Sequence, residues 1–253
     1  MVAGMNVTPL CAQPEFCAIP AAAGIRGRVK EMRPGFQRSA DLAGPAGRLE
    51  ALLNEGAPDA PLAALVCHPH PLGSGTLHNK VVYHIMKVFN GPEWGFQFPV
   101  LRFNFRGAGL SAGRHDGEAE IGDVEAALAW LENEFKRPIL AAGFSFGAAM
   151  TLKACCREGA ARGNIYALAA AGLPMETAGR EYIYPFLQGC TLPKLFLSGD
   201  HDPFAPRADL MRVATTAAGP KQLIFIPGAD HFFTGQLEPM QKALAGWLKE
   251  QMS

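Results

Sequence analysis

Short apolar runs of strand length alternate along this chain with segments of helical length. The run at 62–67 reads Leu-Ala-Ala-Leu-Val-Cys, and a second occupies 138–142. Such runs, without polar alternation, are typical of strands buried on both faces, as in parallel sheets. Because parallel strands need a crossover connection, usually a helix, the alternation predicts an α/β fold with a mostly parallel, twisted sheet and helices on both faces.

The same pattern can be followed along most of the chain. The predicted strands lie at 62–67, 99–105, 138–142, 165–170, 194–198 and 222–226. The predicted helices lie at 80–89, 119–135, 147–158, 206–218 and 235–250. Before them, 36–42 and 48–53 flank the turn cluster Gly44-Pro45-Ala46-Gly47 and are predicted to form an antiparallel pair.

The predicted helix at 119–135 has an apolar face and an acidic start. Its apolar residues recur at spacings of three and four and form a stripe predicted to pack on the sheet: Ile121, Val124, Leu128 and Leu131. Its first acidic residues are predicted to interact with the positive end of the helix dipole: Glu120, Asp123 and Glu125.

Length and composition predict one folded domain. The chain has 253 residues, of which 49% are hydrophobic and 18% charged, enough for a large core. Residues 1–24 mix Pro, Ala, Gly and Cys without periodicity, so we expect an irregular N-terminal arm there. A single α/β domain is predicted over 25–253.

Charge and hydropathy exclude two classes of partner. Lys plus Arg equals Asp plus Glu at 23 each, and no basic run is present, so we expect no nucleic-acid binding. No apolar stretch approaches the roughly 18 residues that span a bilayer, and the first residues lack the pattern of a signal peptide. The sequence therefore predicts a cytoplasmic protein with no membrane partner.

The cysteines predict free thiols. Six are spread along the chain, and none has Cys-x-x-Cys spacing. In a cytoplasmic protein most of them are expected to be free and buried. The alternative is a pair between Cys11 and Cys17 in an oxidising compartment.

The strongest chemical motif is Gly143-Phe144-Ser145-Phe146-Gly147, which reads Gly-x-Ser-x-Gly. It lies between the predicted strand at 138–142 and the predicted helix at 147–158. At a strand-to-helix turn of this kind, a serine adopts a strained backbone and its hydroxyl is exposed above the sheet. The motif predicts that Ser145 is a nucleophile.

A nucleophilic serine needs a base, and the base needs a carboxylate. Asp200 and Asp202 follow the predicted strand at 194–198, and Asp230-His231 follows the strand at 222–226. Both clusters are therefore expected at the carboxyl ends of parallel strands, where open sheets bind ligands. His231 is the candidate base, and the three aspartates compete for the acid role.

The motifs and their order resemble the α/β-hydrolase superfamily over about residues 30–250. The order Ser, Asp, His is the one found in that superfamily. Further segments resemble small bacterial dienelactone-hydrolase-like and Xaa-Pro-dipeptidyl-peptidase-like serine hydrolases: His68-Pro69-His70-Pro71-Leu72-Gly73-Ser74-Gly75-Thr76, Asn79-Lys80-Val81-Val82 and Phe105-Arg106-Gly107-Ala108-Gly109-Leu110-Ser111. Dienelactone hydrolase itself has a cysteine where this chain has Ser145.

The resemblance implies roles for particular residues. It places the acid last in Gly-x-x-Asp, which is Asp202. Asp200 is then expected to be a loop residue that bonds to its own backbone, and Asp230 to be a turn-former that takes the acid role if the Asp202 loop points away. It implies an oxyanion hole made of the backbone N–H groups of Phe146 and His70. Arg106 is expected to brace the loops around the site, and a short lid segment is expected at 173–189.

Neither a metal nor another cofactor is predicted. His68, His70, His78 and His84 lie close in sequence, but their spacing matches no zinc motif. Gly73-Ser74-Gly75 completes no nucleotide-binding motif.

The sequence as a whole predicts a serine hydrolase of the carboxylesterase kind. Its partner is expected to be a small-molecule ester or thioester, cleaved through an acyl-enzyme by Ser145, His231 and Asp202. Two alternatives stay open: a peptidase or acyltransferase with the same triad, and a non-catalytic binding protein of the same fold. The sequence gives no oligomeric state.

Overall fold

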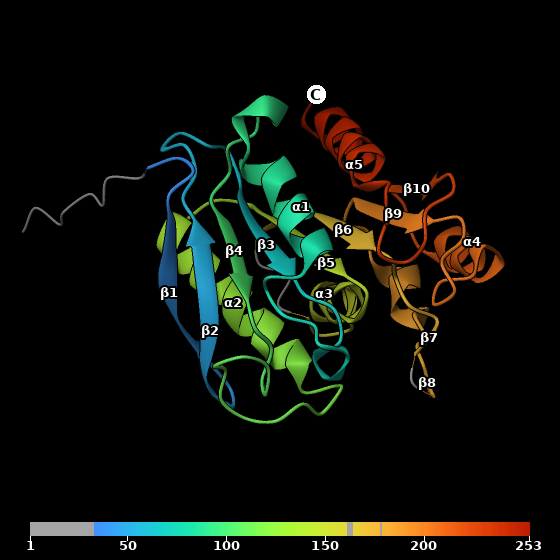
Figure 1. The fold of residues 1–253 in the computed structure, drawn as a ribbon, viewed down its shortest axis with the longest axis horizontal. Helices are drawn as coiled ribbons and strands as arrows, with labels where there is room; N and C mark the ends of the chain where they lie inside the picture. Colours follow the sequence, from blue (N-terminus) through green and yellow to red (C-terminus); the bar gives the residue numbers. More distant parts are fainter. Residues whose placement is uncertain (1–32, 161–163, 178) are drawn as a thin grey trace, which may run out of the picture. The chain divides into compact units, whose positions relative to one another are not determined.

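The computed structural model describes residues 33–160, 164–177 and 179–253. Eight strands form one sheet in the order β1-β2-β4-β3-β5-β6-β9-β10 (Figure 1). From β4 to β10 neighbouring strands pair in parallel, while β2 is antiparallel to β1 and β4. The predicted mostly parallel α/β fold is confirmed. The predicted arm, 1–24, lies outside the described residues.

The elements follow the predicted order. The strands of the main sheet are β1 (Gln37–Gly44), β2 (Gly47–Asn54), β3 (Ala63–Cys67), β4 (Val100–Phe103), β5 (Ile139–Phe144), β6 (Ile165–Ala171), β9 (Lys194–Gly199) and β10 (Lys221–Ile226). The α-helices are α1 (Lys80–Asn90), α2 (Glu120–Phe135), α3 (Phe146–Cys156), α4 (Arg207–Thr216) and α5 (Leu237–Met252). Three 3-10 helices are η1 (Pro71–Gly73), η2 (Pro92–Trp94) and η3 (Pro185–Gly189).

The expected lid segment, 173–189, forms structure that the sequence pattern did not predict. It contains a two-stranded hairpin of β7 (Glu176–Thr177) and β8 (Arg180–Glu181), followed by η3. Strands of two residues are too short to show a periodicity. The segment's two tyrosines, Tyr182 and Tyr184, are buried, and the Tyr184 hydroxyl donates to the Pro174 carbonyl.

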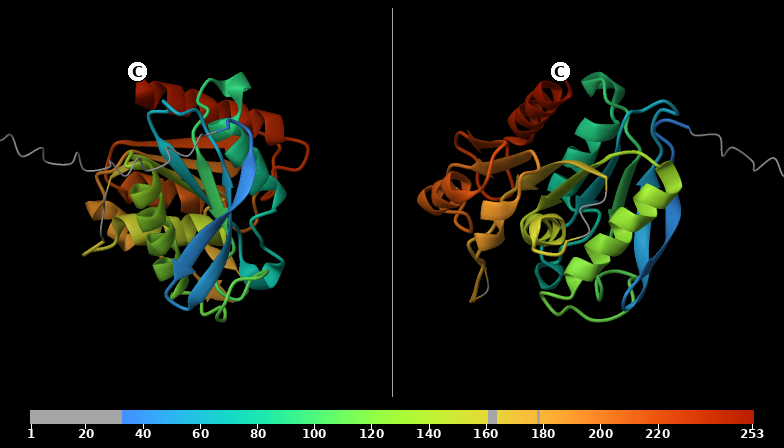
Figure 2. Two further views of the ribbon diagram at one scale, coloured as in Figure 1. Left: turned by 90° about the vertical axis from the view of Figure 1, so that its left-hand side faces the viewer. Right: turned by 180° about the vertical axis from the view of Figure 1, so that it is seen from behind.

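Two apolar clusters cover the two faces of the sheet. The helices α2, α3 and α4 pack on one face, and α1 and α5 pack on the other. The left view of Figure 2 shows α1 and α2 on opposite sides of the strands. The predicted stripe of α2 is buried as expected. No helix in the described ranges is long and apolar enough to cross a membrane.

The sheet determines where the functional loops meet. The strands β3, β5, β9 and β10 run in the same direction, so the loops that follow them emerge at one edge. These loops carry His70, Ser145, Asp202 and His231. The fold therefore brings together residues separated by up to 161 positions in sequence, from 70 to 231.

The prediction of mostly free thiols needs correction. Cys156 at the end of α3 and Cys190 after η3 form a disulfide, with their Cα atoms 5.1 Å apart. Sequence spacing cannot reveal such a pair, because it depends on where η3 packs.

Cys67 and Cys155 are free and buried, and burial raises the pKa of the Cys67 thiol to about 12. Cys11 and Cys17 lie outside the described residues. Because disulfides are rare in the cytosol, the cytoplasmic location stays a prediction.

The disulfide generates a prediction about stability. It closes a loop across 34 positions and ties η3 to the helix that begins after Ser145. A cross-link over a loop of this length contributes about 2–4 kcal/mol to the free energy of unfolding. Reduction should therefore lower Tm by several degrees in a thermal melt. In Cys190→Ser, the same reductant should produce no further shift, and an equal shift in both proteins would contradict the prediction.

Candidate active site

Ser145 lies at the turn between β5 and α3 in a strained backbone conformation. Its φ of 56° and ψ of −123° are unusual for a residue with a side chain. Its N–H donates to the Ala171 carbonyl at 2.9 Å, which fixes the turn to the end of β6. Such strain persists only where the surrounding structure enforces it, so the predicted nucleophile elbow is present.

The two motif glycines allow the backbone to pack tightly around Ser145. A Cβ on Gly143 would lie 2.4 Å from the carbonyl carbon of Gly147. A Cβ on Gly147 would lie 2.4 Å from the His68 carbonyl oxygen. Both distances are far below van der Waals contact, and both neighbours are backbone atoms. Glycine is therefore required for α3 to begin so close to β5 and the loop after β3.

The structure brings Ser145, His231 and Asp202 into one chain of hydrogen bonds. Nε2 of His231 lies 3.0 Å from Oγ of Ser145, and Nδ1 lies 2.8 Å from Oδ2 of Asp202. All three residues are buried: Ser145 is 6% exposed, His231 4% and Asp202 5%. In this geometry the imidazole can accept the serine proton while the carboxylate fixes its tautomer.

Asp202, the one of the three candidate acids that bonds to His231, is held by further donors. Its Oδ1 accepts from the N–H groups of Phe204 and Ala205, at 2.9 and 3.2 Å. Its Oδ2 also accepts from the Ser198 hydroxyl at 3.2 Å. These bonds orient the carboxylate toward His231.

The competing aspartates have other partners. Asp200 accepts from the Gly228 N–H, so it connects two loops rather than bonding to its own backbone as expected. Asp230 accepts from the N–H groups of Phe232 and Thr234, and the Thr234 bond is the main cause of a lowered pKa at Asp230. Asp230 is thus a turn residue, as expected.

Three aromatic rings surround His231. The ring centres of Phe144, Phe204 and Phe232 lie 4.9, 4.7 and 5.1 Å from that of the imidazole. Phe232 is half exposed, so one side of the imidazole remains near solvent. The rings limit the movement of the base.

The expected oxyanion-hole groups are available. Phe146 is the first residue of α3, where helical N–H groups have no intrahelical acceptor. Within the described ranges, neither the Phe146 N–H nor the His70 N–H donates to another backbone or side-chain group. A small pocket of about 130 Å³ lies over Ser145, lined by Pro69, His70, Gly73, Asn79, Ser145, Thr177, Phe204, His231 and Phe232.

His68 fixes the loop that carries His70. Its Nδ1 donates to the Pro69 carbonyl at 2.6 Å, and its Nε2 accepts from the Phe105 N–H at 2.9 Å. Burial lowers the pKa of His68 to about 4. The neutral ring is required, because a protonated Nε2 would face the Phe105 N–H. His70 itself lines the pocket, and its pKa is also lowered, first by burial and then by His115.

Arg106 braces the neighbouring loop, as expected. Its guanidinium and backbone N–H all donate to the Asp123 carboxylate, at distances from 2.7 to 3.2 Å. Asp123 and Glu120 are fully buried, and Glu120 accepts from the N–H groups of Asp116 and Gly117. The expectation that these two acids only interact with the helix dipole was therefore incomplete, because both also anchor loops.

Several pocket residues were missed by sequence reasoning. Thr177, Phe204 and Asn79 line the pocket together with the triad. Thr177 lies on the two-residue strand β7, so no periodicity marked it. Phe204, two positions after Asp202, could have been noticed from that proximity. Among the described residues, no group of three or more His, Cys, Asp and Glu side chains could hold a metal ion.

Comparisons with known proteins place this site in a family. The chain is 37% identical over 216 residues to an uncharacterised protein of Rickettsia prowazekii, covering 81% of this chain and 86% of that protein. It is 30% identical to the structure of an α/β serine hydrolase homologue from Coxiella burnetii, with a TM-score of 0.72, covering 83% of this chain and 96% of the other. A Xanthomonas campestris structure, an α/β serine hydrolase without a lid, is 27% identical with a TM-score of 0.71, covering 87% and 97%. No protein-family model matches the chain.

The chain belongs to the α/β serine hydrolase superfamily. The fold, the turn at Ser145 and the hydrogen-bonded Ser145, His231 and Asp202 agree with this membership.

The buried His68 generates a prediction about pH. Its pKa is about 4 in the folded protein and near 6.5 when unfolded, so the unfolded chain binds more protons between these values. The free energy of unfolding should therefore fall as pH drops from 6.5 toward 4, by on the order of 3 kcal/mol from this residue. Urea unfolding at several pH values measures the slope.

The matched variants for this test are two histidine substitutions. His68→Gln should reduce the slope of the free energy of unfolding against pH, by an amount that corresponds to at most one bound proton. His78→Gln, at an exposed histidine, should leave that slope unchanged. A wild-type slope retained in His68→Gln would contradict the assignment.

Proposed function

We propose that the protein is a hydrolase of carboxylic esters that works through an acyl-enzyme on Ser145. The observation that carries the proposal is the buried, continuous Ser145–His231–Asp202 hydrogen-bonded chain, 3.0 and 2.8 Å between its members. A serine held by strain next to a base with an oriented carboxylate is the arrangement that activates a hydroxyl for attack on a carbonyl.

The first half-reaction acylates the serine. Oγ of Ser145 attacks the ester carbonyl while Nε2 of His231 takes its proton, and Asp202 stabilises the imidazolium. The negative charge on the carbonyl oxygen is stabilised by the N–H groups of Phe146 and His70. His231 then gives the proton to the departing alkoxide, and the alcohol leaves.

The second half-reaction reverses these roles with water. His231 takes a proton from water, the hydroxide attacks the acyl-enzyme carbonyl, and Ser145 recovers its proton from the imidazolium. The carboxylic acid is released. A peptidase or an acyltransferase would use the same residues. We favour the ester because an alkoxide is a better leaving group than the amide anion that cleavage of a peptide bond would have to expel, and because the pocket over Ser145 is small, about 130 Å³.

The proposal is tested by comparing two aspartates and Ser145 in one assay. Hydrolysis of 4-nitrophenyl acetate is followed in the wild type and in Asp202→Asn, which should lower kcat by about 10⁴ through loss of the correct imidazole tautomer. Asp230→Asn, at the adjacent turn residue, should leave kcat close to the wild-type value. Ser145→Ala should remove turnover and leave Tm nearly unchanged.

Two outcomes would contradict the proposal. One is undiminished hydrolysis by Ser145→Ala, which would mean that another group attacks the ester. The other is an equal loss in Asp202→Asn and Asp230→Asn, which would leave no particular role for Asp202.

A further inference from the structure

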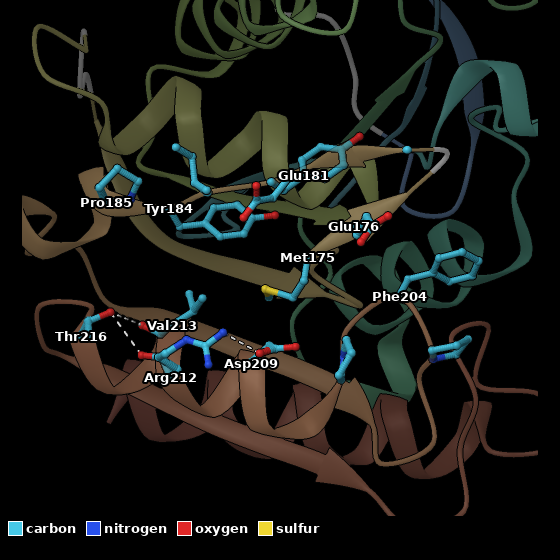
Figure 3. A pocket seen from close by; sticks show the side chains of 15 residues that line it. Met175, Glu176, Glu181, Tyr184, Pro185, Phe204, Asp209, Arg212, Val213 and Thr216 are labelled. Atoms are coloured by element: carbon cyan, nitrogen blue, oxygen red, sulfur yellow. Dashed lines mark hydrogen bonds and ion pairs between the residues drawn. The ribbon is translucent and has the colours of Figure 1, made fainter.

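A second cavity lies between α4 and the segment that contains the β7–β8 hairpin and η3. Its volume is about 720 Å³, against about 130 Å³ for the pocket over Ser145. Figure 3 shows one wall formed by the β7–η3 segment, with Tyr184 and Glu181, and the opposite wall formed by α4, with Asp209 and Arg212. We call this cavity the α4 groove.

The α4 groove adjoins the pocket over Ser145 at Phe204, although none of Ser145, His231 and Asp202 lines the groove itself. This residue lines both the groove and the small pocket, and its ring lies 4.7 Å from the His231 ring. Its N–H also donates to Asp202. In Figure 3, Phe204 lies at one end of the groove and Thr216 at the other. The groove therefore extends from the side of the imidazole.

The mechanism determines which part of an ester lies on that side. The departing oxygen must receive its proton from Nε2 of His231, so the alcohol part lies next to the imidazole. We infer that the α4 groove binds the alcohol part of the substrate, while the small pocket binds a short acyl group. The inference rests on the proposed esterase function and adds its substrate class.

The charges of the groove narrow that class. Glu176 and Glu181 are cross-strand partners in the hairpin, and neither forms an ion pair with any residue in the described ranges. Asp209, in contrast, pairs with Arg212 at 2.5 Å. Like charges placed opposite each other repel, and an anionic leaving group would add to this repulsion. The α4 groove therefore fits a bulky alcohol that is neutral or cationic. It disfavours an anionic leaving group, such as a thiol that carries a phosphate.

The charge preference is tested with three esters that share one acyl group. These are phenyl acetate, 3-acetoxybenzoate and 3-(trimethylammonio)phenyl acetate. Each kcat/KM is divided by the rate constant for hydrolysis of the same ester by hydroxide, which corrects for the esters' different intrinsic reactivities. The expected order is cationic, then neutral, then anionic. In the double variant Glu176→Gln, Glu181→Gln, the ratio of normalised kcat/KM between the cationic and the anionic ester should fall several-fold. An anionic ester that is hydrolysed best by the wild type would overturn the charge assignment.

The position of the alcohol is tested with two adjacent threonines of α4. Thr215 and Thr216 are both exposed, and both hydroxyls donate to a carbonyl one turn earlier, but only Thr216 lines the groove. Thr216→Trp should lower kcat/KM several-fold for 4-biphenylyl acetate and leave phenyl acetate unaffected. Thr215→Trp should change neither.

The rate of deacylation distinguishes the two parts of the substrate. Both acetates form the same acetyl-enzyme, so a groove that binds the alcohol leaves the deacylation rate unchanged in Thr216→Trp. Slower deacylation of a long acyl chain in that variant, or no size dependence at all, would overturn the assignment while the esterase function stands. Failure of the wild type to hydrolyse any ester would contradict the proposed function and the assignment with it.

Discussion

The close approach of three backbone segments around Ser145 is the constraint on which the site depends. Helix α3 begins directly at the end of β5 and against the loop after β3, with room for no side chain at Gly143 or Gly147. This approach keeps Ser145 in its strained conformation and leaves the first N–H of α3 free. The same contact joins the nucleophile to the His68 loop, whose His70 supplies the second proposed oxyanion donor.

The other catalytic groups are positioned by the parallel sheet rather than by contacts in sequence. Asp202 and His231 follow adjacent strands, β9 and β10, so their loops meet at one edge beside Ser145. Hydrogen bonds from backbone N–H groups orient the carboxylate, and aromatic rings confine the imidazole. The segment after β6 lines both cavities, with Thr177 at the small pocket and Glu176 at the α4 groove.

Much of the fold and the triad could be predicted from sequence because each depends on local signals. Continuous apolar runs predict buried strands, and Gly-x-Ser-x-Gly predicts the turn at Ser145. The missed features depend on tertiary packing. The hairpin of β7 and β8 is too short for a periodicity, the Cys156–Cys190 disulfide depends on the position of η3, and the buried acids Glu120 and Asp123 appear in sequence as ordinary helix-start charges.

The central claim is that Ser145 is a nucleophile activated by His231, and covalent labelling tests it most directly. The purified protein is treated with a fluorophosphonate, and the modified residue is located by peptide mass spectrometry in the wild type and in His231→Ala. The account predicts one label per chain, at Ser145, and little or no label in the variant. A folded wild-type protein that stays unlabelled, or a label of equal extent without His231, would contradict it.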